Sequence, residues 1–234
     1  MKSPNNKDLA GFRDVQNLAY RCAETVASQM TPGITERETA ALMQAFLDAE
    51  GADDCFHRPF AWFGDRTAFR GFIGFKHLGG FNPAFYPGHR RLEENMPFIL
   101  DCAPTCNGYT ADIGYCGVIG SNPTLDKLMD DLLEYRVLIL DLVRQRRTLA
   151  EVSRAVDQLC QKHGYEPRHK AYPFEVLAHR VEKLEDDGQK RHLSLARFGV
   201  RNISALLKER LRGAKEGWSP LWNSGAGSEH PPTP

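Results

Sequence analysis

Two aspartates on either side of a predicted turn could hold a divalent metal ion between them. Asp101 and Asp112 lie in the segment 98–120, and Asn107-Gly108 between them favours a two-residue type I′ turn, because both residues tolerate a positive φ. The resulting register places both carboxylates on one face of the hairpin as diagonal neighbours, with Cβ atoms about 7–8 Å apart or less. Two like charges on a half-buried face repel each other, and a divalent cation between them removes that cost.

Simpler interpretations of the same hairpin stay open at this point. A carboxylate on a strand often faces water or pairs with arginine, and a one-residue bulge would turn one of the two aspartates to the opposite face. An α+β protein with an ordinary hairpin and no site is therefore one of the hypotheses that the sequence allows.

The composition is that of a globular protein without a charge bias. The chain has 234 residues, of which 41% are hydrophobic, and its 30 basic residues balance 30 acidic ones, so no nucleic-acid partner is expected. The first residues lack the apolar stretch of a secretory signal, and no segment is apolar enough to span a membrane, which predicts a cytoplasmic protein without membrane contact. Six cysteines without paired spacing are expected to be small buried side chains rather than disulfides or zinc ligands.

Periodic apolar positions predict two helices before the hairpin and three after it. A threonine followed three residues later by glutamate forms a capping box at two of the helix starts, at Thr35 with Glu38 and at Thr148 with Glu151. The predicted helices span residues 8–30, 35–50, 122–147, 148–163 and 203–212, and the residues from 213 onward are predicted to be loop or tail.

The segments between the helices are expected to form strands. Residues 55–88 are rich in aromatic residues and glycine, which suits short strands with long loops, and residues 172–181 are predicted to form a further strand. The order helix, helix, strands, then helix, helix, strand predicts an α+β fold with a repeated pattern whose second copy is incomplete. We expect one domain over residues 1–220 and a loop or disordered tail over residues 221–234.

In these features the chain resembles the pita-bread metallopeptidases, the family of methionine aminopeptidase, aminopeptidase P, prolidase and creatinase. The likeness rests on the helix opening at residues 33–41, the segment from Phe98 to Asp112, the glycine at position 120, and His179 on a strand after two helices. Phe56-His57 together with residues 63–67 is similar to a segment of aminopeptidase P-like members. The resemblance implies the pita-bread fold, with two pseudo-symmetric halves around a curved antiparallel sheet.

The resemblance implies a site for two divalent metal ions. Asp101 would bind one ion, Asp112 would bridge the two, and His179 would complete the second site. The mixed carboxylate and imidazole donors suit manganese, cobalt, iron or zinc. The ions would activate a bridging water to attack a bond near the N-terminus of a peptide substrate.

A histidine that contacts the scissile carbonyl is also implied by the resemblance. His89 precedes the first metal strand by a short loop, although its spacing to Asp101 is short for the family. His57 and His77 compete for the same catalytic role. A structural or surface histidine is the alternative interpretation for each of the three.

Three departures from the family pattern bear on activity. Asp112 is followed by Ile113 rather than by Thr-Arg-Thr, and His179 is followed by Arg180 rather than by Gly-Ile-Gly. The two glutamates that would complete the family site are missing. Glu209 is not expected to replace one of them, because it lies on a charged helix face where a solvated ion pair is the commoner role. The chain is expected to be truncated before its last two strands or naturally degenerate.

Two functions follow from the resemblance. The first is a metal-dependent peptidase of the Xaa-Pro aminopeptidase type, with an incomplete metal site and little activity in this chain. The alternative is a catalytically inactive pita-bread module that binds a peptide or protein partner through the same cleft. Similar proteins are usually dimers, and the aromatic side chains of this sequence permit a homodimer.

Overall fold

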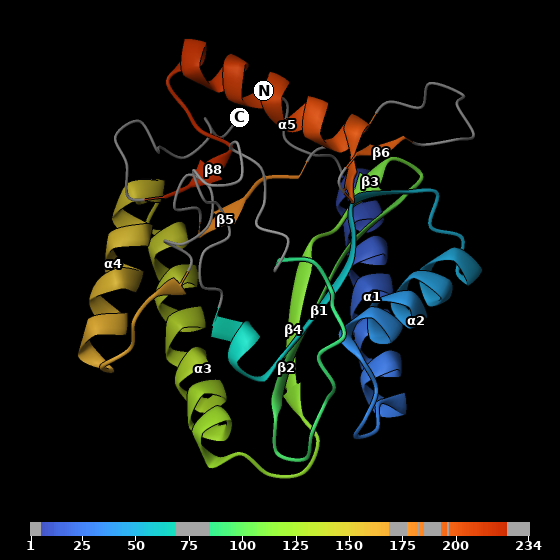
Figure 1. Cartoon of the computed structure of the whole chain (residues 1–234). Helices are drawn as coiled ribbons and strands as arrows, with labels where there is room; N and C mark the ends of the chain where they lie inside the picture. Colours follow the sequence, from blue (N-terminus) through green and yellow to red (C-terminus); the bar gives the residue numbers. More distant parts are fainter. Residues whose placement is uncertain are drawn as a thin grey trace, which may run out of the picture.

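The computed structural model describes residues 6–68, 85–168, 177–181, 183–184, 193–195 and 197–223 (Figure 1). His77 and the first half of the strand predicted over residues 172–181 lie outside the described residues.

Helices and antiparallel strands alternate as the α+β prediction requires. The first part of the chain forms α1 (Asn6–Gln29), α2 (Glu36–Ala49), β1 (Asp54–Phe63), the 3-10 helix η1 (Gly64–Ala68), β2 (Pro97–Cys106), β3 (Tyr109–Thr110) and β4 (Ile113–Val118). The second part forms α3 (Pro123–Arg144), α4 (Leu149–Lys162), β5 (Ala178–His179), β6 (Ser194–Leu195), β7 (Phe198–Gly199), α5 (Val200–Glu216) and β8 (Leu221–Trp222).

Both predicted capping boxes are confirmed. The Thr35 hydroxyl accepts a hydrogen bond from the main-chain N–H of Glu38, whose carboxylate accepts one from the Thr35 N–H, and this reciprocal pair begins α2. Thr148 and Glu151 form the same arrangement at the start of α4. Local hydrogen bonding therefore fixes where these two helices begin, as the sequence predicts.

The main sheet has the strand order β3-β2-β1-β7-β6, and β4 also pairs with β2. Every pairing within the described strands is antiparallel. Helices α1 and α2 cover one face of this sheet, and α3 and α4 lie apart from them on the other side of the molecule (Figure 1). Strands β5 and β8 form a separate two-stranded sheet beside α4.

The main sheet is buried on both faces around β2. Phe98, Leu100 and Cys102 belong to the core that packs between the sheet and helices α1 and α2, which we call the helix-side core. Ile99, which lies between two of them, packs on the opposite face. The residues buried on that opposite face form an aromatic cluster of Phe60, Trp62 and Phe85.

The hairpin register predicted from the sequence is confirmed. Thr105 lies opposite Thr110, and Cys102 lies opposite Ile113. The register is therefore the same before and after Asp112. The two turn residues have φ values of 51° and 78°, as a type I′ turn requires. No bulge therefore separates the two strands of the hairpin around the aspartates.

The C-terminal part is more regular than predicted. Helix α5 extends to Glu216 rather than ending at residue 212, and Leu221–Trp222 form β8 where the sequence predicted a tail. The Gly213 main chain lies so close to Trp218 that a Cβ there would come within 2.5 Å of the Trp218 carbonyl oxygen. Trp218 and Leu221 are buried, and this packing orders a segment whose sequence shows no periodic pattern.

No helix in the described ranges is both long and apolar enough to cross a membrane. The six cysteines are free thiols, and Cys22 and Cys102 are fully buried among them.

Candidate metal centre

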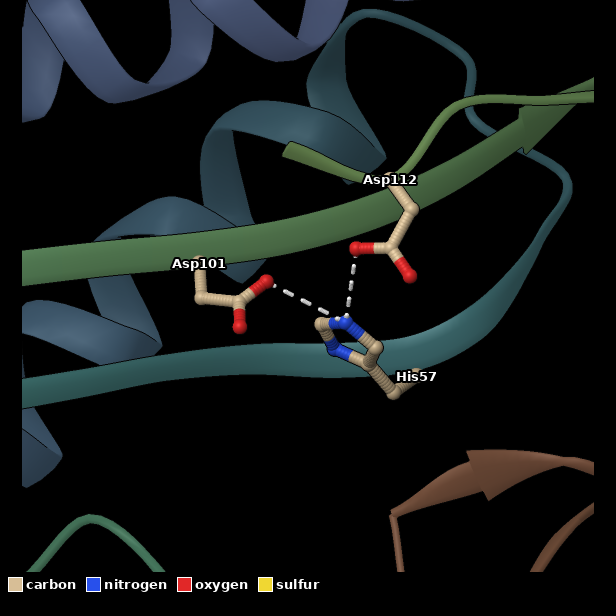
Figure 2. Close-up of side chains that lie close together, drawn as sticks. All are labelled: His57, Asp101 and Asp112. Carbon is tan, nitrogen blue, oxygen red and sulfur yellow. Dashed lines mark hydrogen bonds and ion pairs between the residues drawn. The ribbon is translucent and has the colours of Figure 1, made fainter. Parts of the chain in front are cut away.

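His57, Asp101 and Asp112 converge on the sheet face opposite α1 and α2 (Figure 2). One ligand atom from each residue lies within 4.8 Å of the other two. The Nε2 atom of His57 is 3.2 Å from Oδ1 of Asp101 and 3.3 Å from Oδ1 of Asp112. Figure 2 shows the imidazole reaching from β1 toward both carboxylates.

The alternation of the hairpin strands explains why both carboxylates point to this face. Successive side chains on a strand point to opposite faces, so an aspartate flanked by core residues must point away from that core. The prediction of one shared face for Asp101 and Asp112 is therefore confirmed. The flanking residues, which all belong to the helix-side core, are Leu100, Cys102, Ala111 and Ile113.

Two β-bulges in β1 bring His57 to the same face. The pairing of β1 with β2 shifts by one residue between Cys55 and His57, and by one more between His57 and Phe60. In a regular strand His57 and Phe60 would point to opposite faces, because they are three residues apart. The second bulge instead places both rings on the Asp101 face, with their centroids 5.2 Å apart. The resemblance had marked His57 as a candidate catalytic histidine, but sequence alternation cannot reveal a bulge, so its approach to both aspartates was not predictable.

His179 reaches Asp112 from the short strand β5. Its Nε2 atom is 2.9 Å from Oδ2 of Asp112. Its ring stacks on Phe56, with the centroids 5.0 Å apart and the ring planes inclined by 27°. The structure thus brings together the three residues predicted to be metal ligands, and Phe56 is a supporting residue that the sequence analysis did not identify in this role.

Both histidines donate a hydrogen bond from Nδ1 to a main-chain carbonyl. His57 Nδ1 is 3.0 Å from the carbonyl oxygen of Arg58, and His179 Nδ1 is 3.1 Å from that of Arg180. A carbonyl oxygen can only accept, so Nδ1 carries a proton in each ring and Nε2 is the atom directed at Asp112. Metal-binding histidines are oriented by this kind of second hydrogen bond.

The four side chains change one another's pKa values. Burial alone would lower the pKa of His57, but the carboxylates of Asp101 and Asp112 raise it well above its ordinary value of 6.5. Burial alone would also lower the pKa of His179. The hydrogen bond to Asp112 outweighs this effect of burial, so the pKa of His179 is raised above its ordinary value. Burial raises the pKa of Asp101, whereas contacts with both histidines overcome burial and lower the pKa of Asp112. A cationic centre is therefore favoured between the two carboxylates.

These residues fit a divalent metal ion. Asp101 Oδ1 is buried and has no hydrogen-bond partner among the described residues. Within the same residues, the ion pairs of Asp101 and Asp112 are formed with histidines. The side chains of Asp101, Asp112 and His179 stay 19%, 23% and 20% exposed, so a solvated ion has access. Carboxylate oxygens and imidazole nitrogens are common ligands of first-row divalent metals.

Two other candidates lie away from this group. His89 is exposed in the loop beside the start of α2, where it interacts electrostatically with Glu38. Its catalytic role stays a prediction. Glu209 on α5 pairs with Arg212 at 2.5 Å but is only 7% exposed, so the prediction of a solvated ion pair is wrong. Glu209 lines a small cavity together with Val181 and Leu184 and lies 4.0 Å from the Arg180 guanidinium, so the segment after β5 covers this part of α5.

Residues 10–199 match the sequence model of metallopeptidase family M24. The chain belongs to this family. The pita-bread fold predicted from the sequence is confirmed by the family match and by solved structures of the same fold. This M24 chain therefore carries its converging aspartates and histidines in the fold of a metallopeptidase.

The relatives of this M24 chain are distant and longer. An uncharacterised peptidase of Staphylococcus aureus (strain bovine RF122 / ET3-1) is 21% identical over 159 residues, which are 68% of this chain and 42% of that protein. The X-Pro aminopeptidase of Thermotoga maritima MSB8 superimposes with a TM-score of 0.57 at 19% identity, over 69% of this chain and 42% of that one. The prolidase of Pyrococcus furiosus gives a TM-score of 0.53 at 19% identity, over 69% and 44%. The chain thus spans less than half of the length of these relatives.

Proposed function

We propose that the protein is a metal-dependent peptidase of the Xaa-Pro aminopeptidase or prolidase type, which hydrolyses a peptide bond near the N-terminus of its substrate. The observation that carries this proposal is the convergence of Asp101, Asp112 and His179, from separate segments of the chain, within an M24 fold. The names of the similar structures support the substrate class. The homodimer and the cytoplasmic location stay predictions.

The residues of this chain have distinct parts in holding the ion. The two carboxylates of Asp101 and Asp112 balance the charge of one divalent cation. Asp112 directs its two oxygens to different histidines, so it is the residue suited to bridge. When bound, the metal supplies a Lewis acid that polarises a peptide carbonyl and activates water.

An aromatic cluster beside the site provides apolar surroundings for the substrate. Phe60 and Phe198 lie 5.2 Å and 6.0 Å from the His57 ring, measured between ring centroids. Phe60 also stacks on Trp62 at 5.2 Å. Phe198 is only partly buried and offers its ring to a proline ring, whereas Phe60 and Trp62 are buried and support it from behind.

A peptidase assay with added manganese, cobalt or zinc tests the proposal. We expect hydrolysis of Xaa-Pro peptides over matched Xaa-Ala peptides, strictly dependent on metal and slow in this chain. Asp112→Asn should lower the rate by at least about 100-fold, because the bridging carboxylate charge is lost. Metal retention without any hydrolysis would favour the inactive peptide-binding module, and a protein that retains no metal would contradict the proposal.

A further inference from the structure

We propose that His57 is itself a metal ligand, and that His57, Asp101 and Asp112 together hold one divalent ion. This inference rests on the proposed function only in assuming that the site binds metal. The ligand set that the family resemblance implies does not include His57, so the assignment comes from the geometry of this chain.

The position of His57 is the first argument. Strand β1 has one bulge on each side of His57, so its regular pairing with β2 is interrupted twice. The two bulges together set the face to which the His57 side chain points. The altered backbone is held from the turn that precedes β7, because the Arg58 N–H donates to the Arg197 carbonyl at 2.7 Å. The Arg197 side chain donates to the carbonyl of Pro59. The fold thus maintains an irregular strand that presents His57 to the two carboxylates.

The hydrogen bonding of the His57 ring is the second argument. Because Nδ1 donates to the Arg58 carbonyl, a neutral ring presents the lone pair of Nε2 to two carboxylate oxygens. A positive centre is required to make that arrangement favourable. A proton on Nε2 is one solution, but a single N–H points in one direction and the Oδ1 atom of Asp101 still lacks a hydrogen bond. A metal ion serves all three donor atoms at once.

The distances are the third argument. Charged N–H···O bonds are typically about 2.7–2.9 Å long, and both contacts of His57 Nε2, at 3.2 Å and 3.3 Å, exceed that range. Ligands held about 2.0–2.2 Å from a tetrahedral or octahedral ion lie about 2.8–3.6 Å from each other. The two distances from His57 Nε2 to the carboxylate oxygens therefore match neighbouring ligands of one ion better than the members of a hydrogen-bonded ion pair.

Zinc binding tests the assignment without any need for activity. We expect the His57→Gln variant to lose more than about 100-fold in zinc affinity, which exceeds the 10–100-fold loss typical of removing an outer-shell hydrogen bond. X-ray absorption of the zinc-loaded protein should show one imidazole fewer in this variant than in the wild type. The matched control is His163→Gln, since His163 pairs with Glu134 between α3 and α4 and should change neither value.

A second variant gives a positive signal. In the His57→Cys variant loaded with cobalt, a thiolate ligand should produce a thiolate-to-cobalt charge-transfer band in the near ultraviolet that the wild type lacks. A His57→Gln variant with a loss of 100-fold or less and an unchanged imidazole number would overturn the proposal, as would a His57→Cys protein without the band. If those results occur while Asp112→Asn still abolishes binding, only the role of His57 fails. A wild type that binds no zinc would contradict both this proposal and the proposed function.

Discussion

The guanidinium group of Arg197 donates a hydrogen bond to the carbonyl oxygen of Pro59, which lies 138 residues earlier in the chain. Pro59 lies in the bulged part of β1, between His57 and Phe60. Arg197 also accepts a hydrogen bond from the Arg58 N–H through its own carbonyl. One residue of the second half of the chain therefore holds the strand irregularity that directs His57 toward the aspartates.

Replacement of Arg197 by alanine should weaken metal binding without removing a ligand. We expect about a 10–100-fold loss of zinc affinity, because the ring of His57 would be less well oriented, while the imidazole number stays that of the wild type. Isothermal titration and X-ray absorption measure the two quantities. Arg90→Ala is the control, because Arg90 is an exposed residue whose contact with Glu93 spans 3.7 Å. Unchanged affinity in Arg197→Ala would show that the bulge does not need this side chain.

Alanine at Gly108 should destabilise the protein more than alanine at Gly164. Both glycines have a positive φ, of 78° and 74°, so both substitutions strain the backbone. Only at Gly108 would the new Cβ lie 2.3 Å from a main-chain oxygen, that of Leu184, whereas the space around Gly164 is open. We expect a loss of about 1 kcal/mol for Gly164→Ala and about 2–4 kcal/mol for Gly108→Ala in urea unfolding. Equal losses would contradict a tight approach at the hairpin turn.

Removal of the Glu36 side chain should cost about 3–5 kcal/mol of unfolding free energy, the range expected when one partner of a buried ion pair is lost. Glu36 is fully buried and accepts hydrogen bonds from the Arg66 side chain at 2.6 Å and from the N–H groups of Phe63 and Gly88. Glu36→Ala leaves Arg66 without this partner. The control Glu93→Ala, on an exposed loop, should stay within about 0.5 kcal/mol of the wild type. A small effect at Glu36 would mean that the surrounding groups find other partners.

Acidic pH should reduce the contribution of the capping box at the start of α4. Hydrogen bonds from the Thr148 N–H and hydroxyl hold the pKa of Glu151 below its ordinary value of 4.5. A carboxylate whose pKa is lower in the folded state adds stability above the unfolded pKa, and that stability is lost as the pH falls through the folded pKa. The stability difference between wild type and Glu151→Gln should therefore be larger at neutral pH than at strongly acidic pH. A difference that does not vary with pH, or the same variation in the exposed control Glu24→Gln, would contradict this expectation.

Local sequence accounts for much of the hairpin and of the helix starts. Asn107-Gly108 fixes the turn through its tolerance of positive φ, and the turn then fixes the register that places Asp101 and Asp112 on one face. The two capping boxes likewise depend on residues only three positions apart. Such features are predictable because the interacting groups are neighbours in sequence, and the family resemblance added His179 to the site.

Other features depend on contacts between distant segments. Residues from 213 onward are predicted from the sequence to be loop, but the burial of Trp218 and Leu221 accompanies an α5 that extends to Glu216 and an ordered β8. Glu209 is likewise predicted to be solvated, whereas it lies buried beside the segment around Arg180. Neither outcome follows from periodicity, because each depends on which surface the segment meets in the folded chain.

The sequence by itself determined that two carboxylates share one face of a hairpin, because strand alternation and turn chemistry are local properties of the chain. Only the tertiary structure decided that His57 lies between them. Its direction depends on two bulges, and the second of these is held by Arg197, which directly precedes β7, the strand that pairs with β1 on the side away from β2. A residue whose orientation is set by a strand more than a hundred positions away carries no local pattern, and the candidate metal centre therefore became complete only in the folded chain.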